Sequence, residues 1–560
     1  LRADDGVRLP PLLPREDGAD APLSFSQERL WLLQRIAPRS PAYNISTVLR
    51  FGGALDAGAM ERAVAEIVRR HHALRTVILQ TDAGPLQRVT AGGFPLPLHD
   101  LASLPADQAE SEARERVRRE WMTPFEIEGG ALFRAMLIRI AADDHVLHLA
   151  AHHTVFDGWS AGVLQRELAT LYEAFSRGEP SPLADLPVQY ADYAAWQRGW
   201  MTDEAAGRQV AYWRDRLEGA PPLLELPTDR PRPAVQGYAG GMVESAIEPG
   251  LVAGVRALAR REGATPFMVL LAALDVVLSR WSGQEDLVVG TQVAGRTHAG
   301  TEPLIGVFLN TLAIRADLSG APGFRELLGR VREATLGAYA HQDVPFERVL
   351  DALRVPRMLG HSPVFQVMIN YQNFGAGSAA PASLERRPFA DAEPTSKVDM
   401  TLYASEDPQG IALGLVYSAE LFEAPRMREL LAQVTAVLEQ AVADAGRSVA
   451  EMPLRTAEAA ALLPDPSQPL DRTWRGSVPE IFARRAGERP GALAVADPLE
   501  RWTYAELDAA TARIARRLAE GGVRPGDTVA IWAHRSAAMA RAMVGVLRAG
   551  AAFVALDPAY

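Results

Sequence analysis

The 560-residue chain contains no cysteine, which excludes disulfide bonds, cysteine nucleophiles and thiolate metal sites. It also lacks a basic excess: 69 acidic residues outnumber 58 basic ones, so the formal net charge is −11 and nonspecific nucleic-acid binding has no electrostatic source. No run of about 18 apolar residues occurs, and the first residues lack the apolar core of a signal peptide. We therefore expect no nucleic-acid partner, no membrane partner and a cytoplasmic location.

What is present is the composition of an ordinary soluble protein, with 48% hydrophobic and 23% charged residues. At roughly 100–200 residues per domain, the chain is long enough for several domains with substantial cores. The opening residues 1–21 are charged and rich in proline, as in a linker, so we expect the first domain to begin near residue 22.

The most informative segment is HLAAHHTVFDGWSAGVL, which spans residues 148–164. Read at period two, a strand from His145 to His153 places His152 and His153 on opposite faces, so at most one of them readily faces a reaction site. Asp157 follows at a turn, where it would cap a helix. Imidazole is the side chain best suited to move protons near neutral pH. Taken alone, however, such a pair at a strand end is more often structural.

The stretch HHTVFDG at 152–158 is similar to the HHxxxDG signature of the condensation domains of nonribosomal peptide synthetases, relatives of chloramphenicol acetyltransferase. Further segments resemble the other motifs of this family and occur in the family's order. They are SFSQERLW at 24–31, RHHALRT at 70–76, YADYAAWQ at 190–197, IGVFLNTL at 305–312, HQDVPFE at 341–347 and SPVFQVM at 362–368. Together they cover residues 22–455, and chance agreement in that order is negligible.

A second resemblance begins after these motifs. WTYAEL at 502–507 and LRAGAAFVALDP at 547–558 look like the first two core motifs of an adenylation domain. The chain stops at Tyr560, before the phosphate loop such a domain needs, so we expect an incomplete adenylation domain that forms no acyl-adenylate. ATP and magnesium would serve only the complete domain. Condensation followed by adenylation is the order of an elongation module, and we expect an excised piece of a longer enzyme.

The resemblance implies an α/β fold with two chloramphenicol acetyltransferase-like lobes that form a V-shaped pseudo-dimer, followed by a partial α/β adenylation subdomain. The expected parts are an upstream linker at 1–21, an N-terminal lobe at 22–180, a C-terminal lobe at 181–455, a linker at 456–474 and an adenylation fragment at 475–560. Two substrate arms must reach one point from separate carriers, so we also expect a tunnel between the lobes with His153 deep inside it.

Local patterns predict the elements around the motifs. In the first lobe we expect paired strands at 134–140 and 145–153, and helices that start after the caps Ser24, Asp56 and Asp157. In the second lobe and beyond, the expected strands lie at 286–293, 307–315, 364–371, 528–532 and 552–556. The expected helices lie at 266–281 (after the Thr265-Pro266 start), 324–339, 425–443, 503–519 and 537–549. In chain order, the four elements after residue 500 alternate between helix and strand, which predicts a parallel sheet.

The resemblance implies amide formation, in which the amine of a downstream aminoacyl thioester attacks the carbonyl of an upstream acyl or peptidyl thioester. The expected partners are the upstream and downstream peptidyl carrier domains and the rest of the adenylation domain. The 4′-phosphopantetheine arms belong to those carriers and not to this chain, and no metal is expected. A thiol of pKa ~8.5 leaves readily and an α-amine of pKa ~8 is partly neutral at pH 7, so strong activation is unnecessary. Holding the two arms together can contribute about 7–11 kcal/mol.

His153 is the candidate catalytic group: it either takes the amine proton or orients the amine, and the sequence leaves both roles open. His152 is expected to face the fold. Asp157 is expected to form a buried salt bridge that shapes the loop, with Arg296 or Arg315 as its partner.

Gly158 is the second candidate for direct catalysis, because a glycine lets the backbone approach the reacting carbonyl and its amide could stabilise the oxyanion. A plain turn glycine is the alternative. Four further residues are assigned to the lining of the site: Trp159, Ser160, Asn310 and Ser362. Core packing is the alternative for Trp159. The segment LGHS at 359–362 resembles a phosphopantetheine attachment sequence, but it precedes a strand rather than a carrier helix, so we do not assign it that role.

Related domains differ in recognisable ways. Epimerisation domains usually follow HHxxxDG with an order other than Trp159-Ser160, and heterocyclisation domains replace the histidines with aspartates. SFSQERLWLL and HQDVPFERVL look like the condensation subtype that accepts an L-configured donor, although His72 stands where that subtype commonly has glutamate. We therefore predict peptide-bond formation with an L-configured donor. The alternatives are an epimerisation-type relative and a noncatalytic recruitment or docking domain, and the intact HHxxxDG motif argues against the second.

Overall fold

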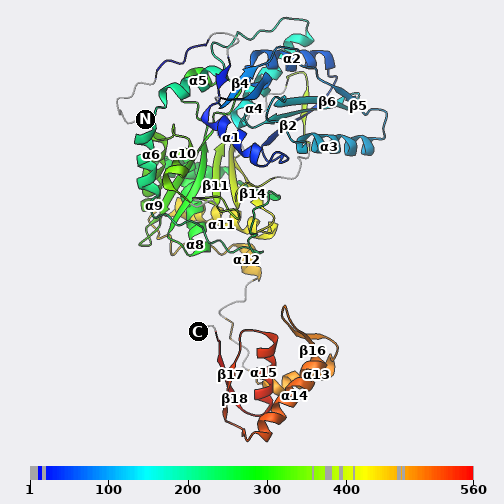
Figure 1. Ribbon diagram of the computed structural model, residues 1–560, viewed down its shortest axis with the longest axis vertical. Helices are drawn as coiled ribbons and strands as arrows, with labels where there is room; N and C mark the ends of the chain where they lie inside the picture. The colour runs from blue at the N-terminus through cyan, green and yellow to red at the C-terminus, as the bar shows by residue number, and fades with distance from the viewer. Residues whose placement is uncertain are drawn as a thin grey trace. The chain divides into compact units, whose positions relative to one another are not determined.

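The computed structural model describes residues 10–15, 20–82, 84–355, 358–372, 381–389, 395–407, 410–462, 468–469 and 473–558. Parts of the two expected linkers lie outside the described residues, namely 1–9, 16–19, 463–467 and 470–472. The chain divides into two compact units, Leu1–Leu462 and Leu463–Tyr560. Within the first unit, Figure 1 shows an N-terminal lobe in blue and cyan and a C-terminal lobe in green and yellow.

The N-terminal lobe is built on a five-stranded sheet in the order β12-β2-β7-β6-β5. The bounds are β2 Asn44–Gly52, β5 Leu98–Asp100, β6 Phe133–Ala141, β7 Asp144–His152 and β12 Glu385–Arg387. β7 is buried along its whole length and runs antiparallel to β2 and β6. The strands expected at 134–140 and 145–153 are present, but β7 ends at His152, so His153 belongs to the following turn.

Helices cover both faces of this sheet because its side chains alternate at period two. On one face Leu147 and Leu149 pack with α2 and α4, and on the other Val146 packs with α3. The helices are α1 Phe25–Ile36, α2 Ala57–Arg70, α3 Ala106–Met122 and α4 Gly158–Ser176, and a small sheet is formed by β1 Ala21–Pro22, β3 Thr76–Thr81 and β4 Gly84–Val89. The caps expected for α1, α2 and α4 are present, since each side chain accepts a backbone N–H of the first turn.

The C-terminal lobe holds a six-stranded mixed sheet in the order β10-β9-β11-β13-β14-β8. The strands are β8 Gly240–Ile247, β9 Asp286–Val293, β10 Asn310–Asp317, β11 Val367–Gln372, β13 Met400–Asp407 and β14 Gly410–Ser418. The helices are α5 Tyr190–Trp200, α6 Asp203–Leu217, α7 Pro249–Arg261, α8 Pro266–Ser282, α9 Phe324–Ala340, α10 Phe346–Leu353, α11 Ala424–Ala443 and α12 Ala457–Leu462. The expected strand at 307–315 begins only at Asn310, because the residues before it bind the α4 cap.

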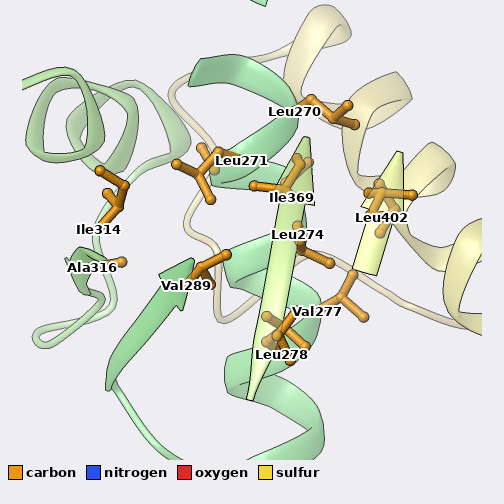
Figure 2. Packing of buried hydrophobic residues seen from close by; sticks show 14 of the residues in the cluster. Leu270, Leu271, Leu274, Val277, Leu278, Val289, Ile314, Ala316, Ile369 and Leu402 are labelled. Carbon is orange, nitrogen blue, oxygen red and sulfur yellow. The ribbon is translucent and has the colours of Figure 1, made fainter. Parts of the chain in front are cut away.

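Helix α8 lies at the centre of this lobe. Figure 2 shows its Leu271 and Leu274 among side chains of the sheet, including Val289 of β9 and Ile369 of β11. Every α8 side chain from Phe267 to Leu278 is buried, which explains why its sequence is apolar on all sides rather than along one stripe.

Two features tie the lobes together. Strand β12 follows β11 in the chain, yet it pairs with β2 of the N-terminal lobe, although the sequence analysis assigned its residues to the C-terminal lobe. A further apolar cluster joins Trp31 of α1 with Tyr190 and Tyr193 of α5 and with Phe308. The chain therefore crosses between the lobes more than once, whereas the expected lobes at 22–180 and 181–455 imply a single connection.

The second unit contains α13 Val478–Glu488, β15 Leu493–Ala496, β16 Arg501–Thr503, α14 Tyr504–Glu520, β17 Thr528–Trp532, α15 Ala537–Arg548 and β18 Ala552–Leu556. β17 and β18 are parallel, as the alternation of helix and strand predicted. Among the described residues, no single helix is long and apolar enough to cross a membrane, and only the bent pair α7 and α8 meets that length and composition together. The same residues hold no group of three potential metal ligands.

Candidate active site

The HHTVFDG motif occupies the turn between β7 and α4. The N–H of His152 donates to the carbonyl of Leu132, and the N–H of His153 donates to the carbonyl of Tyr43, both at 2.9 Å. The N–H of Val155 closes the turn onto the carbonyl of His152 at 3.0 Å. The backbone of the two histidines is thus held by neighbours on both sides.

The half-buried His153 ring is held in one tautomer. Its Nδ1 lies 2.8 Å from the carbonyl oxygen of Phe156. Because a carbonyl oxygen only accepts, Nδ1 carries the proton and the neutral ring keeps a lone pair on Nε2. Burial lowers the pKa of His153 to about 4, the positive charge of Lys397 adds to this, and Asp157 acts in the opposite direction. At neutral pH the ring is therefore uncharged and can accept a hydrogen bond.

His152 points into the fold, as the alternation of the strand predicted. It has no solvent exposure, and its Nδ1 accepts the N–H of Thr154 at 3.3 Å. Its Nε2 consequently carries the proton and lies 3.4 Å from Oε1 of Gln34. The ring packs edge-on against Phe125, with centroids 6.0 Å apart. Burial lowers the pKa of His152 to about 3, so this histidine stays neutral and packs as part of the core.

Asp157 is fully buried and saturated with partners. Its Oδ1 accepts the N–H of Ser160 at 2.8 Å and lies 3.2 Å from Nη2 of Arg296, whose side chain is only 2% exposed. Its Oδ2 accepts the N–H of Phe308 at 3.0 Å, and the Arg296 guanidinium lies 4.0 Å from the Phe308 ring centroid. Arg296 also donates to the carbonyls of Thr301 and Leu304. The carboxylate thereby joins the start of α4 to the segment that precedes β10.

The structure identifies Arg296 as the partner of Asp157. Arg315, the other candidate, forms an ion pair with Asp286 of β9, with Nη2 2.7 Å from Oδ2. It also donates to the carbonyls of Arg216 and Glu218. The assignment of Arg315 to the site is corrected accordingly: it braces the far end of β10 against the end of α6.

Gly158 is the first residue of α4 and is exposed. A methyl group built on it would meet no atom within 4 Å, whereas one built on Gly306 would lie 2.0 Å from Cδ2 of Tyr190. Packing therefore requires glycine at Gly306, where the loop crosses a tyrosine ring, but not at Gly158. The space beside Gly158 is open.

The four residues assigned to the lining have structural partners. Ser160 is fully buried, and its Oγ donates to Asp157 or to the carbonyl of Gly306, so it fastens the loop instead of lining a surface. Trp159 is half-buried and donates its Nε1–H to the carbonyl of Glu302 at 2.9 Å.

Asn310 donates to the carbonyls of Gln342 and Val344, both at 2.7 Å, and so fixes the segment before α10. The carbonyl of Ser362 accepts from Nε2 of Gln366 at 2.9 Å, which holds the start of β11. Neither residue contacts the motif turn through a hydrogen bond in the part of the chain that the structure describes.

Lys397, which belongs to none of the sequence motifs, also lies at the site. Nζ of Lys397 is 4.6 Å from the ring centroid of Tyr43, whose carbonyl holds the His153 amide. Part of the Lys397 residue is exposed, but protein surrounds its ammonium, and this desolvation lowers the pKa of Lys397 to about 8. The sequence does set this residue apart, because the 58 basic residues comprise 57 arginines and this single lysine.

A cavity of about 310 Å³ lies between the lobes and is lined by residues close in sequence to this pair. Its walls include Ala42 and Trp121 from the N-terminal lobe and Tyr238 and Thr395 from the C-terminal lobe. Ala42 precedes Tyr43 in the chain, and Thr395 lies two residues before Lys397. The cavity volume lies at the lower end of the range of ligand pockets.

Family models match nearly the whole chain. The model described as "Condensation domain" matches residues 18–463, and the model described as "AMP-binding enzyme" matches residues 482–560.

Two curated relatives have similar sequences. A linear gramicidin synthase polypeptide from Brevibacillus parabrevis is 43% identical over 556 residues, which are 98% of this chain and 11% of that protein. Phosphinothricin tripeptide synthetase PhsC from Streptomyces viridochromogenes is 38% identical over 570 residues, which are 100% of this chain and 52% of that protein. The chain therefore spans about a tenth of the first relative and about half of the second.

Solved structures have a similar fold. The X-domain in its complex with OxyB from teicoplanin biosynthesis is 28% identical, with a TM-score of 0.71 over 80% of this chain and 99% of that one. A four-domain nonribosomal peptide synthetase, holo-AB3403 bound to AMP and glycine, has a TM-score of 0.73 over 100% of this chain and 43% of its own. At 24% identity, the second likeness concerns the fold alone.

Proposed function

Because the chain belongs to the condensation-domain family of nonribosomal peptide synthetases, an amide-forming acyltransferase family, we propose that it joins two carrier-bound substrates through a peptide bond. The amine nitrogen of a downstream aminoacyl thioester bonds to the carbonyl carbon of an upstream acyl or peptidyl thioester. The carbon–sulfur bond breaks, the amine loses one proton and the leaving thiolate gains one. Both substrates arrive on 4′-phosphopantetheine arms of carrier domains, and the donor residue has the L configuration.

The observation that carries this proposal is the tautomer of His153. With Nδ1 donating to Phe156, the lone pair of Nε2 can accept a hydrogen bond from the attacking amine. A pKa lowered to about 4 makes this imidazole a weak base at neutral pH, since an efficient general base has a pKa near the working pH. His153 accordingly orients the amine and does not hold its proton.

Gly158 and Asp157 have separate roles in this scheme. The amide of Gly158 stands at the N-terminus of the 19-residue helix α4, where the helix dipole favours negative charge, and the open space beside it can admit the reacting carbonyl. Asp157, capping α4 and paired with Arg296, holds that N-terminus in place. His152 supports the same turn from within the core.

We also propose a role for each part of the chain. Residues 22–180 and 181–455 act as the two lobes of the condensation domain, apart from the crossing strand β12. A tunnel between them admits the two arms, and its support is a cavity that residues of both lobes line, among them Ala42, next to Tyr43, and Thr395, two residues before Lys397. Residues 475–560 are the N-terminal part of an adenylation domain and need the rest of that domain before ATP and magnesium can act.

A single-turnover assay tests the function. The full chain is mixed with two carrier proteins, one loaded with an L- or a D-configured donor and one with an aminoacyl acceptor, and product is followed by mass. We expect a dipeptide on the acceptor carrier, faster with the L donor. The matched control is the His153→Ala protein.

Absence of product for a panel of donors and acceptors would overturn the proposal. The alternative would then be recruitment of a partner protein, a role suggested by the likeness to the X-domain in complex with OxyB.

A further inference from the structure

Lys397 makes a cross-lobe contact with the loop that supports His153. Its ammonium lies over the Tyr43 ring at 4.6 Å, and the backbone of Tyr43 accepts the N–H of His153 at 2.9 Å. The Tyr43 ring also packs against His152, with centroids 6.4 Å apart. A single tyrosine thus connects a lysine of the C-terminal lobe to both histidines of the N-terminal lobe.

The segment that carries Lys397 is firmly anchored. Two residues on, the buried Asp399 forms an ion pair with Arg232, with Nη1 2.7 Å from Oδ1. On the other side, the N–H of Ser396 donates to the carbonyl of Tyr238 at 3.1 Å, and its hydroxyl donates to the carbonyl of Val398 at 2.6 Å. The position of the ammonium is therefore set by the C-terminal lobe and not by a mobile chain end.

Among the described residues, few other charged groups lie near this lysine. On α1, Arg29 repels the ammonium but is itself paired with Glu347, its Nε 2.8 Å from Oε1. The hydroxyl of Tyr43 stays protonated because burial raises its pKa, and its electrostatic neighbours are Arg29, Tyr238 and Glu347. His152 and His153 are neutral. On the far side of the turn, Asp157 is neutralised by Arg296.

We propose that Lys397 is a positioning residue for the amide-forming step: held over Tyr43, its ammonium fixes the loop that supports His153 and places a positive charge at the reaction centre. The proposal rests on the proposed function and adds a residue of the second lobe to it. A positive charge in a poorly solvated space disfavours protonation of any nearby base. His153 and the incoming amine both stay neutral, which keeps the amine nucleophilic and His153 able to accept its hydrogen bond.

The choice of lysine fits this role. The other 57 basic side chains of the chain are arginines, so this position departs from the strong preference of the chain for arginine. An ammonium is a compact point charge, and it can lie over an aromatic ring without a carboxylate partner. Among the described residues, no carboxylate forms an ion pair with Lys397.

Replacement by methionine and by arginine separates charge from shape. Lys397→Met keeps the length and removes the charge, and we expect the single-turnover rate to fall about tenfold or more, as for loss of a desolvated cation–π contact. Its acid limb in the pH–rate profile should move to higher pH, because His153 and the amine both bind protons more readily without the ammonium. Lys397→Arg should keep the acid limb in place and most of the rate. The matched control is Arg541→Met, which removes an arginine lying 4.8 Å from the Trp502 ring in the second unit.

The outcomes are distinct. A Lys397→Met protein with the wild-type rate and acid limb would overturn the proposal, and so would a reduced rate with an unmoved acid limb, which indicates a purely structural role. Equal losses in the methionine and arginine variants would show that the charge is not what matters. If the wild-type protein itself forms no amide, the proposed function fails. That result is distinguishable from the outcomes for the Lys397 variants, which all require an active wild-type protein.

A measurement without turnover complements the kinetics. Reductive methylation with ¹³C-formaldehyde labels the single lysine and the N-terminal amine, and the Lys397→Arg protein identifies the N-terminal signal. We expect the lysine signal to titrate about two pH units below the ~10.4 of a free side chain. Titration near that free value would show a fully solvated ammonium and would overturn the proposal.

Discussion

Asp157 and Arg296 form an ion pair that is almost completely removed from solvent, with their side chains 0% and 2% exposed and 3.2 Å apart. Asp157→Ala would strand the guanidinium and also remove the cap of α4. We expect the free energy of unfolding of the first unit to fall by about 3–5 kcal/mol, and condensation to fall with it. Urea unfolding of the full chain measures the change.

Asp286→Ala is the matched control, because it strands Arg315, whose side chain is 22% exposed and remains hydrated. That substitution should cost no more than about 1 kcal/mol. If Asp157→Ala instead abolished condensation without any change in unfolding, Asp157 would have a direct role in the chemistry.

Features that depend on local sequence could be predicted from it. The strand before the motif followed from period-two alternation, and the start of α4 followed from Asp157 as a cap. Features set by contacts between distant segments could not. Arg296 and Arg315 were equivalent candidates in sequence, and only the fold brings one of them to Asp157.

The crossing strand β12 and the position of Lys397 could not be predicted for the same reason, because both depend on contacts between distant segments. The three residues of β12 carry little periodicity and gain their partner from β2, more than 300 residues earlier in the chain. Lys397 approaches Tyr43 from the other lobe. Ser160 was assigned to the lining, but its hydroxyl donates to Asp157 or to the carbonyl of Gly306, which only the fold brings close to it.

The two histidines should respond differently to removal. His153→Ala is expected to lower the single-turnover rate by about 100-fold or more while leaving the unfolding transition unchanged, because the ring is half-buried and makes one hydrogen bond. His152→Ala empties a site packed against Phe125 and should lower the melting temperature. A folded His153→Ala protein that condenses at the wild-type rate would refute its assignment.

Gly158 and Gly306 form a matched pair for the same substitution. Gly158→Ala adds a methyl group to open space and should leave stability within about 0.5 kcal/mol, while the rate falls by up to about 100-fold because the methyl group displaces the reacting carbonyl. Gly306→Ala drives a methyl group into Tyr190 and should cost about 1–3 kcal/mol. Thermal unfolding and single-turnover rates of both variants test this. Full activity in Gly158→Ala would argue for a plain turn glycine.

Asp275 should make the stability of the first unit depend on pH. It lies in α8 with no exposure, and neither carboxylate oxygen has a hydrogen-bond partner in the part of the chain that the structure describes. Burial raises the pKa of Asp275 well above its ordinary value, so the folded protein holds the acid neutral while the unfolded chain ionises it above about pH 4. This group's contribution is fully present below that pH and declines, by about 1.4 kcal/mol per pH unit, until the folded pKa is reached.

Asp275→Asn, which has nearly the same shape but cannot ionise, isolates this effect. The melting temperatures of the variant and the wild type should be similar near pH 4, and the variant should gain progressively up to pH 8. Asp399→Asn is the opposite control, because Asp399 is buried but paired with Arg232, and its loss should destabilise the protein at neutral pH. A difference in melting temperature between Asp275→Asn and wild type that stays constant from pH 4 to pH 8 would contradict this prediction. It would mean that the pKa of Asp275 is the same in the folded and unfolded protein, since only a shifted pKa makes the difference depend on pH.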